Sequence, residues 1–132
     1  MFLPVDVQTV DEAIKRDPSI EAIYITSPTY DGLCADLKGI KKVIGDRVLV
    51  VDEAHGGACY FNPYMKHNAM NSGADMSMIS SAKSLGGINA LSFVLTNKNS
   101  KISKNKVTNA YKLLATTSRS WVLYTDLEGI IC

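Results

Sequence analysis

The segment that most constrains the fold is residues 47–52, with the sequence RVLVVD. Four consecutive apolar residues, three of them β-branched, end there in a carboxylate. A continuous apolar run is typical of a strand buried on both faces of a parallel sheet, because a strand with one solvated face would alternate apolar and polar residues. The segment therefore predicts an inner strand with Asp52 at its carboxyl end.

The segments around this strand alternate between helix and strand. Three other short apolar segments are predicted to be strands, namely residues 21–26, 75–80 and 90–96. Capping signals and helical apolar spacing predict helices from Thr9 to before Pro18, over residues 33–44 with Gly45 as C-cap, and over residues 107–114. The order of helix, strand, helix, strand, helix, strand, strand and helix predicts an α/β fold, with a mostly parallel sheet and flanking helices. Trp121 and residues 122–124 are expected in the core.

Length, charge and cysteine content exclude several classes of function. The chain has 132 residues, enough for one domain, and a net charge of +1, so no electrostatic attraction to nucleic acid or to an acidic membrane is expected. The three cysteines lack zinc-binding spacing, which favours a reduced, cytoplasmic setting without a metal site. No signal peptide is expected, and the longest apolar run, residues 48–51, is too short to cross a bilayer.

Two ionisable residues, Asp52 and Lys83, each follow a predicted strand. Ligands of parallel α/β sheets bind beyond the carboxyl ends of the strands, so both side chains are expected at one crevice. The alternative is a solvated structural role for each, because strands commonly end at the surface with such residues.

Residues 52–55 spell DEAH, which has two interpretations. A hydrophobic strand ending in Asp-Glu is how a Walker B element presents carboxylates to magnesium, and DEAH also occurs as a helicase motif. A helicase needs a GxxxxGK[ST] loop to hold the triphosphate, and no such loop precedes Asp52. The DEAH-type ATPase is therefore the weaker alternative.

The second interpretation is a site for pyridoxal 5′-phosphate (PLP). Such a site needs a lysine for the Schiff base, a carboxylate opposite the pyridine nitrogen, and donors for the phosphate. Lys83 and Asp52 suit the first two tasks. Lys83 also lies in a loop of small and hydroxyl-bearing residues, SSAKSLGG, which lets a planar cofactor approach the backbone and offers donors to phosphate.

Several segments carry a family resemblance when they are taken in order. They are SPTYDG (27–32), VLVVDEAHGG (48–57), GADMSMISSAKSLGG (73–87) and AYKLLATTSRSWVLYTDL (110–127). Together they resemble the large domain of the ornithine/lysine/arginine decarboxylases, PLP-dependent enzymes with the aspartate aminotransferase fold (fold type I). The resemblance extends from about residue 3 to residue 131 and implies decarboxylation of a basic amino acid.

The resemblance also implies roles for particular residues. Lys83 would form the Schiff base, Asp52 would pair with the pyridine nitrogen, and Ser80 would bind phosphate. Ala54 would pack on one face of the ring, and His55 would lie near the ring hydroxyl and belong to the catalytic set. Two further residues resemble a stretch that reaches a neighbouring subunit's phosphate in the family's dimers, namely Thr117 and Ser118.

Two positions depart from the family pattern, which usually has histidine at position 82 and proline at position 119. Here Ala82 and Arg119 occupy them. Segments of the family's large domain upstream of the resemblance, and its small domain, have no counterpart in residues 1–132. We therefore expect a partial PLP-binding large domain, active as an oligomer or with a complementing chain, on an amino-acid substrate. The alternative function is a non-catalytic relative that acts through association.

Overall fold

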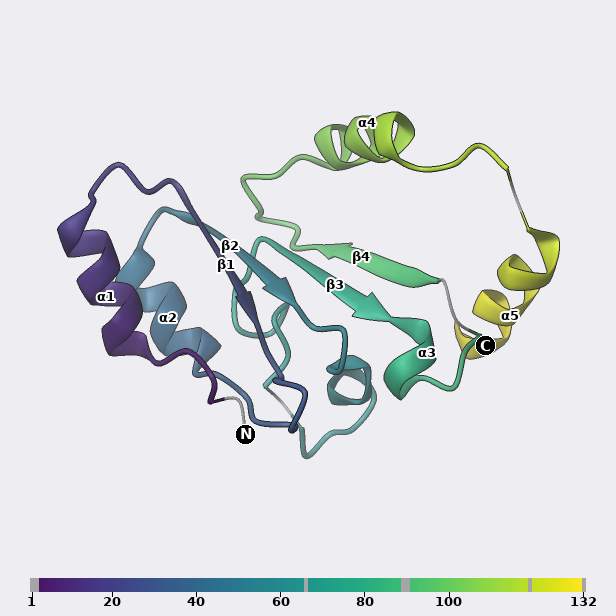
Figure 1. The fold of residues 1–132 in the computed structure, drawn as a ribbon, viewed down its shortest axis with the longest axis horizontal. Helices are drawn as coiled ribbons and strands as arrows, with labels where there is room; N and C mark the ends of the chain where they lie inside the picture. Colours follow the sequence, from purple (N-terminus) through teal and green to yellow (C-terminus); the bar gives the residue numbers. More distant parts are fainter. Residues whose placement is uncertain (1–2, 66, 89–90, 119, 132) are drawn as a thin grey trace.

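The computed structural model describes residues 3–65, 67–88, 91–118 and 120–131. Its strands are β1 (Ala22–Thr26), β2 (Val48–Asp52), β3 (Met76–Ser80) and β4 (Ser92–Thr96). The helices described are α1 (Val7–Arg16), α2 (Leu37–Ile44), the 3₁₀ helix η1 (Gly57–Tyr60), α3 (Ser81–Ser84), α4 (Lys104–Leu114) and α5 (Trp121–Ile131). In Figure 1, α1 and α2 lie beside β1 and β2, whereas α4 and α5 lie toward the β4 end of the sheet.

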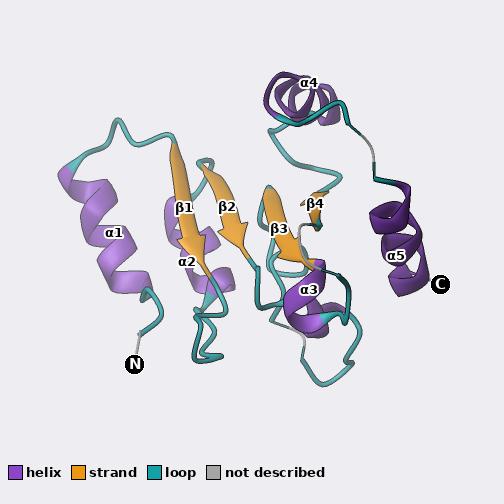
Figure 2. Ribbon diagram, turned by 45° about the vertical axis from the view of Figure 1, so that its right-hand side comes forward, coloured by secondary structure: helices purple, strands orange, loops and turns teal. Residues whose placement is uncertain are grey.

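The four strands form one sheet in the order β1-β2-β3-β4. β1, β2 and β3 are parallel, and β4 pairs with β3 in the antiparallel direction. Asp52 pairs in register with Thr26 on one side and with Met78 on the other, so the first three strands end at the same edge. Figure 2 shows their arrowheads pointing toward the end of the molecule where α3 lies. The expected α/β fold with a mostly parallel sheet is confirmed.

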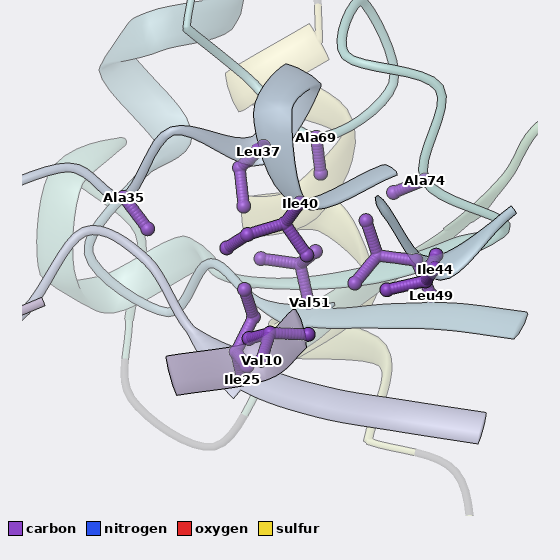
Figure 3. Close-up of a cluster of buried hydrophobic side chains, with 10 residues drawn as sticks. All are labelled: Val10, Ile25, Ala35, Leu37, Ile40, Ile44, Leu49, Val51, Ala69 and Ala74. Carbon is purple, nitrogen blue, oxygen red and sulfur yellow. The ribbon is translucent and has the colours of Figure 1, made fainter. Parts of the chain in front are cut away.

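The hydrophobic core lies between α1, α2 and one face of the sheet. Helical spacing directs Leu37, Ile40 and Ile44 of α2 toward the alternating side chains Leu49 and Val51 of β2. All five are at most 2% exposed. Val10, Ile25, Ala35, Ala69 and Ala74 complete the cluster in Figure 3. Burying this face fixes the register of β2, because a shift by one residue would move Asp52 to the core side.

β2 is not buried on both faces, which corrects the expectation from its apolar run. Val48, Val50 and Asp52 are only half-buried, while the alternate residues are fully buried. Beside β3 and β4, the second face borders an open apolar groove of about 550 Å³ between the sheet and α4. Val94 of the sheet is 49% exposed and Leu114 of α4 is 87% exposed, so α4 covers this face incompletely.

α4 begins at Lys104, three residues before its expected start, and both α1 and α2 also begin at residues other than those expected. α1 is capped by Asp6, whose Oδ1 accepts from the Thr9 backbone N–H at 2.7 Å, so Thr9 lies inside the helix. α2 begins after the N-cap Asp36, not at Leu33, whose N–H instead donates to the Thr29 hydroxyl within a turn. In α1 and α2 a carboxylate offers the first turn a stronger acceptor than the predicted start does. The expected C-cap of α2 is confirmed at Gly45, which has a φ of 59°.

The helix expected between β2 and β3 and the core role expected for residues 121–124 are also corrected. In the described part of the β2–β3 connection, the helical segment is the short η1. Trp121 and Val122 are 73% and 70% exposed at the start of α5, a helix that the apolar pattern had not indicated. These side chains therefore lie on the surface of this chain. The predicted strand over residues 90–96 is observed over Ser92–Thr96, and residue 90 lies outside the described residues.

Asp75 joins three segments at the end of the sheet opposite α3. Its Oδ2 accepts from the Leu49 backbone N–H at 3.0 Å and the Lys41 ammonium at 2.9 Å, and its Oδ1 accepts from the Lys101 N–H at 3.1 Å. Burial alone would raise the pKa of this carboxyl. The hydrogen bonds and the Lys41 charge outweigh burial and hold the pKa below its usual value.

We expect Asp75→Asn to destabilise the fold by about 1–3 kcal/mol at neutral pH, because one acceptor oxygen and its charge are lost. A lowered folded-state pKa stabilises the fold above the unfolded-state value of about 3.9, and this contribution disappears as the pH falls through the folded-state pKa. Urea denaturation from pH 7 to pH 2 should therefore show the two proteins converging at acid pH. The control is Asp46→Asn, whose side chain is fully exposed. A constant difference across this range would contradict the role of the charge.

Candidate functional site

The candidate site lies where β1, β2 and β3 end. β2 ends at Asp52, and the chain turns immediately so that the Ala54 backbone N–H donates to Asp52 Oδ1 at 2.9 Å. The Tyr24 hydroxyl, from the neighbouring strand β1, donates to Asp52 Oδ2 at 3.2 Å. Each carboxylate oxygen thus accepts one hydrogen bond and retains a lone pair that can face a ligand.

Lys83 enters the same site from β3. The strand ends at Ser80 and α3 begins at once, so the lysine stands one short turn beyond the sheet. Lys83 Nζ lies 3.4 Å from Nε2 of His55, which belongs to the turn after β2. The ring of Tyr30, from the loop after β1, meets the His55 ring edge to face with centroids 5.4 Å apart. The segments that follow all three parallel strands therefore contribute to this site.

Close backbone contact holds these loops together. A Cβ atom on Gly57 would lie 2.6 Å from Ser84 Oγ and 2.7 Å from Leu85 Cγ, which is closer than any side chain tolerates. Glycine at this position lets η1 pack directly against the end of α3. This packing brings the loop that carries His55 against the helix that carries Lys83.

Glu53, the neighbour of Asp52, points to the opposite face and is 1% exposed. It accepts hydrogen bonds from the Tyr60 hydroxyl and the Ser77 hydroxyl, both at 2.5 Å, and from the Ala69 N–H at 2.8 Å. Burial and the bond to Glu53 raise the pKa of Tyr60, which keeps this hydroxyl protonated as a donor. The second carboxylate of DEAH therefore connects β2, β3 and the intervening loop inside the protein.

Among the seven site residues predicted from the sequence, the structure shows two contacting pairs. Lys83 and His55 are in contact, and Asp52 and Ala54 are hydrogen-bonded. Ser80 is half-buried at the N-cap of α3, where its side chain makes no capping hydrogen bond. Thr117 and Ser118 are exposed in the segment between α4 and α5, and no contact within the described chain joins them to Lys83. Their predicted role toward a neighbouring subunit stays a prediction, and residue 119 lies outside the described residues.

The sequence patterns did not indicate three residues that lie in or beside the site, namely Tyr24, Tyr30 and Glu53. Strand alternation offered a signal for two of them. Tyr24 lies two residues before the end of β1, on the face that carries Asp52, and Glu53 had to fall on the opposite face. Tyr30 belongs to an irregular loop, whose side-chain direction no periodicity predicts.

The fold and site define an α/β domain that presents a lysine, a histidine and a carboxylate at the common end of parallel strands. Residues 4–129 match the family of the Orn/Lys/Arg decarboxylase major domain. The chain belongs to this family, as the resemblance of its motifs had implied. Family membership and the buried position of Glu53 both argue against the helicase interpretation of DEAH.

Individual relatives agree with the family assignment. The chain is 32% identical over 126 residues to an arginine decarboxylase of Bacillus subtilis, covering 94% of this chain and 26% of that protein. It is also 32% identical over 127 residues to an arginine decarboxylase of Halalkalibacterium halodurans, covering 95% and 26% respectively. An uncharacterized protein of Bacillus subtilis, YaaO, is 30% identical over 133 residues, with 97% and 28% covered. The chain thus spans about a quarter of the length of these relatives.

Within the described ranges, none of the helices combines the length and the apolar character that a membrane crossing requires.

Proposed function

We propose that this chain is part of the PLP-binding large domain of a decarboxylase that acts on a basic amino acid. The observation that carries the proposal is the convergence of Lys83, His55 and Asp52 at the end of parallel strands, in a member of this family. The names of the relatives favour arginine among the three substrates that the family name includes. The proposed setting is the cytoplasm.

The donor set at the site fits PLP. In the described parts of the chain no carboxylate forms an ion pair with Lys83, so its amine is available to the cofactor's aldehyde. Asp52 retains acceptor capacity for the pyridine nitrogen, and the Ser80 hydroxyl is not used to cap α3. Ala82 offers no side-chain donor, so any phosphate contacts must come from other groups.

When PLP is bound, it supplies an acceptor for the electron pair that is released as the bond to the substrate carboxylate breaks. Asp52 would stabilise a proton on the pyridine nitrogen through its opposite charge. Lys83 Nζ would hold the cofactor and then deliver a proton to the substrate carbon. His55 Nε2, 3.4 Å from Lys83 Nζ, can exchange a proton with that amine and limit its movement. Ala54, two residues after Asp52, would present a small apolar surface to the ring.

The test is covalent trapping of PLP on Lys83. Incubation with PLP, reduction with borohydride and peptide mass mapping should place the label on Lys83, and Lys83→Arg should abolish that labelled peptide. Lys98, an exposed lysine in a loop, reports non-specific reaction within the same sample. A label on Lys98 with none on Lys83 would overturn the assignment of the site.

A second candidate function is that of a non-catalytic protein that acts through association with itself or with a related chain. The observation that favours it is the apolar surface of α4 and α5, where Leu113, Leu114, Trp121 and Val122 are 70–87% exposed. Surfaces of this kind in a soluble protein usually mark an interface. The two functions are compatible if association completes the site, so we propose an oligomer or a complementing chain in either case.

A further inference from the structure

Tyr24 is an unusual neighbour for the site carboxylate. It belongs to β1, where it pairs in register with Val50, two residues before Asp52 on the adjacent strand. Diagonal neighbours on one face of a sheet are within reach of a tyrosine side chain. The phenol hydroxyl accordingly donates to Asp52 Oδ2 at 3.2 Å.

Core packing does not account for this tyrosine. The residue is 61% exposed, whereas the residues of β1 and β2 that pack on α2 are buried. Its polar contact is with Asp52, and partial burial together with the charge of this carboxylate raises the pKa of the phenol. The hydroxyl therefore remains a donor at neutral pH.

The two hydrogen bonds on Asp52 have different origins. The Oδ1 bond comes from the backbone of the next turn and is available whenever β2 ends in this way. The Oδ2 bond comes from a side chain of another strand and depends on the identity of one residue. With both bonds in place the side chain is held in one χ1 rotamer, and with only the first it can exchange between rotamers.

We propose that Tyr24 is a positioning residue that fixes the orientation of the Asp52 carboxylate through its hydroxyl. The use of this orientation, to meet the pyridine nitrogen of PLP, rests on the proposed function. The orientation itself is a property of this chain and can be measured without cofactor.

The first measurement is the side-chain torsion of Asp52 in isotopically labelled protein, from the three-bond couplings between Cγ and the backbone nitrogen and carbonyl carbon. Wild type should show the couplings of one staggered rotamer, and Tyr24→Phe should show averaged values. Tyr64→Phe, at a residue that is 92% exposed, is the matched control and should resemble wild type. Unchanged couplings in Tyr24→Phe would overturn the proposal.

The second measurement is the dissociation constant for PLP. Tyr24→Phe should raise it about fivefold, the equivalent of one hydrogen bond, and should have no further effect in the Asp52→Ala background, which has no side-chain acceptor. An equal effect in both backgrounds would show that Tyr24 acts through general structure and would contradict positioning. If wild type takes up no PLP at Lys83, the proposed function fails, while the couplings still decide the role of Tyr24.

Discussion

Replacing Glu53 by alanine is expected to lower the free energy of unfolding by about 3–5 kcal/mol. The substitution leaves the Tyr60 hydroxyl, the Ser77 hydroxyl and the Ala69 N–H without their acceptor in a nearly dry environment. Each buried donor left unsatisfied costs about 1–3 kcal/mol, and partial entry of water offsets some of the total. The effect is large because this single carboxylate, which follows β2, accepts hydrogen bonds from β3, from η1 and from the loop that contains Ala69.

Urea denaturation followed by circular dichroism measures this loss. Glu53→Gln keeps one oxygen acceptor and nearly the same volume, so it should lose distinctly less stability than Glu53→Ala. If Glu53→Ala does not fold, the stability of Glu53→Gln relative to wild type still measures the contribution of the carboxylate. Glu21→Ala, at an exposed position before β1, is the control for removing a glutamate as such. Equal stability of Glu53→Ala and Glu21→Ala would show that the buried network contributes little.

The chain by itself is expected to be at most a very weak decarboxylase. The proposed site contains a lysine, a carboxylate and one hydroxyl that would hold PLP, but the chain spans about a quarter of the length of its relatives. Catalysis depends on fixing the scissile bond relative to the cofactor, and a misplacement of about 1 Å can cost roughly a hundredfold in rate. Turnover should therefore fall far below the enzyme median of about 10 per second.

The assay is carbon dioxide release from arginine, lysine and ornithine, with purified protein and added PLP. Turnover near the enzyme median would contradict the prediction and show that the chain builds a complete site, alone or as an oligomer. Activity that appears only on adding a second chain with the rest of the large domain would support complementation. Lys83→Arg in that mixture should abolish the activity and serves as the control.

The parts of the fold that could be predicted are those fixed by short apolar runs. All four strands were located to within two residues at each described end, because a strand that packs on helices must carry a run of apolar side chains. The meeting of the Asp52 and Lys83 loops followed from the rule that parallel strands share their carboxyl ends. The proposed substrate class came from the resemblance and not from these patterns.

The remaining features depend on contacts between distant segments. The start of α2 at Leu37 was hidden because Leu33 continues the helical spacing although its backbone is held in a turn by Thr29. The exposure of Trp121 could not be foreseen, because hydrophobicity alone does not tell a residue that packs within its chain from one left on the surface. Alternation could have placed Glu53 on the inner face, but its role as an acceptor depends on Ser77 and Tyr60, which are distant in sequence.

The alternation at the end of β2 has a consequence for protein engineering. Asp52 and Glu53 are adjacent in sequence, yet Asp52 contacts Tyr24 at the candidate site and Glu53 faces the interior. A designer can therefore randomise residues on the Tyr24 and Asp52 face to search for new reactivity while leaving the Glu53 network intact. Libraries that vary the whole DEAH tetrapeptide would instead contain many unfolded variants. A selection for activity would then discard variants because they are unstable and not because their site is unreactive.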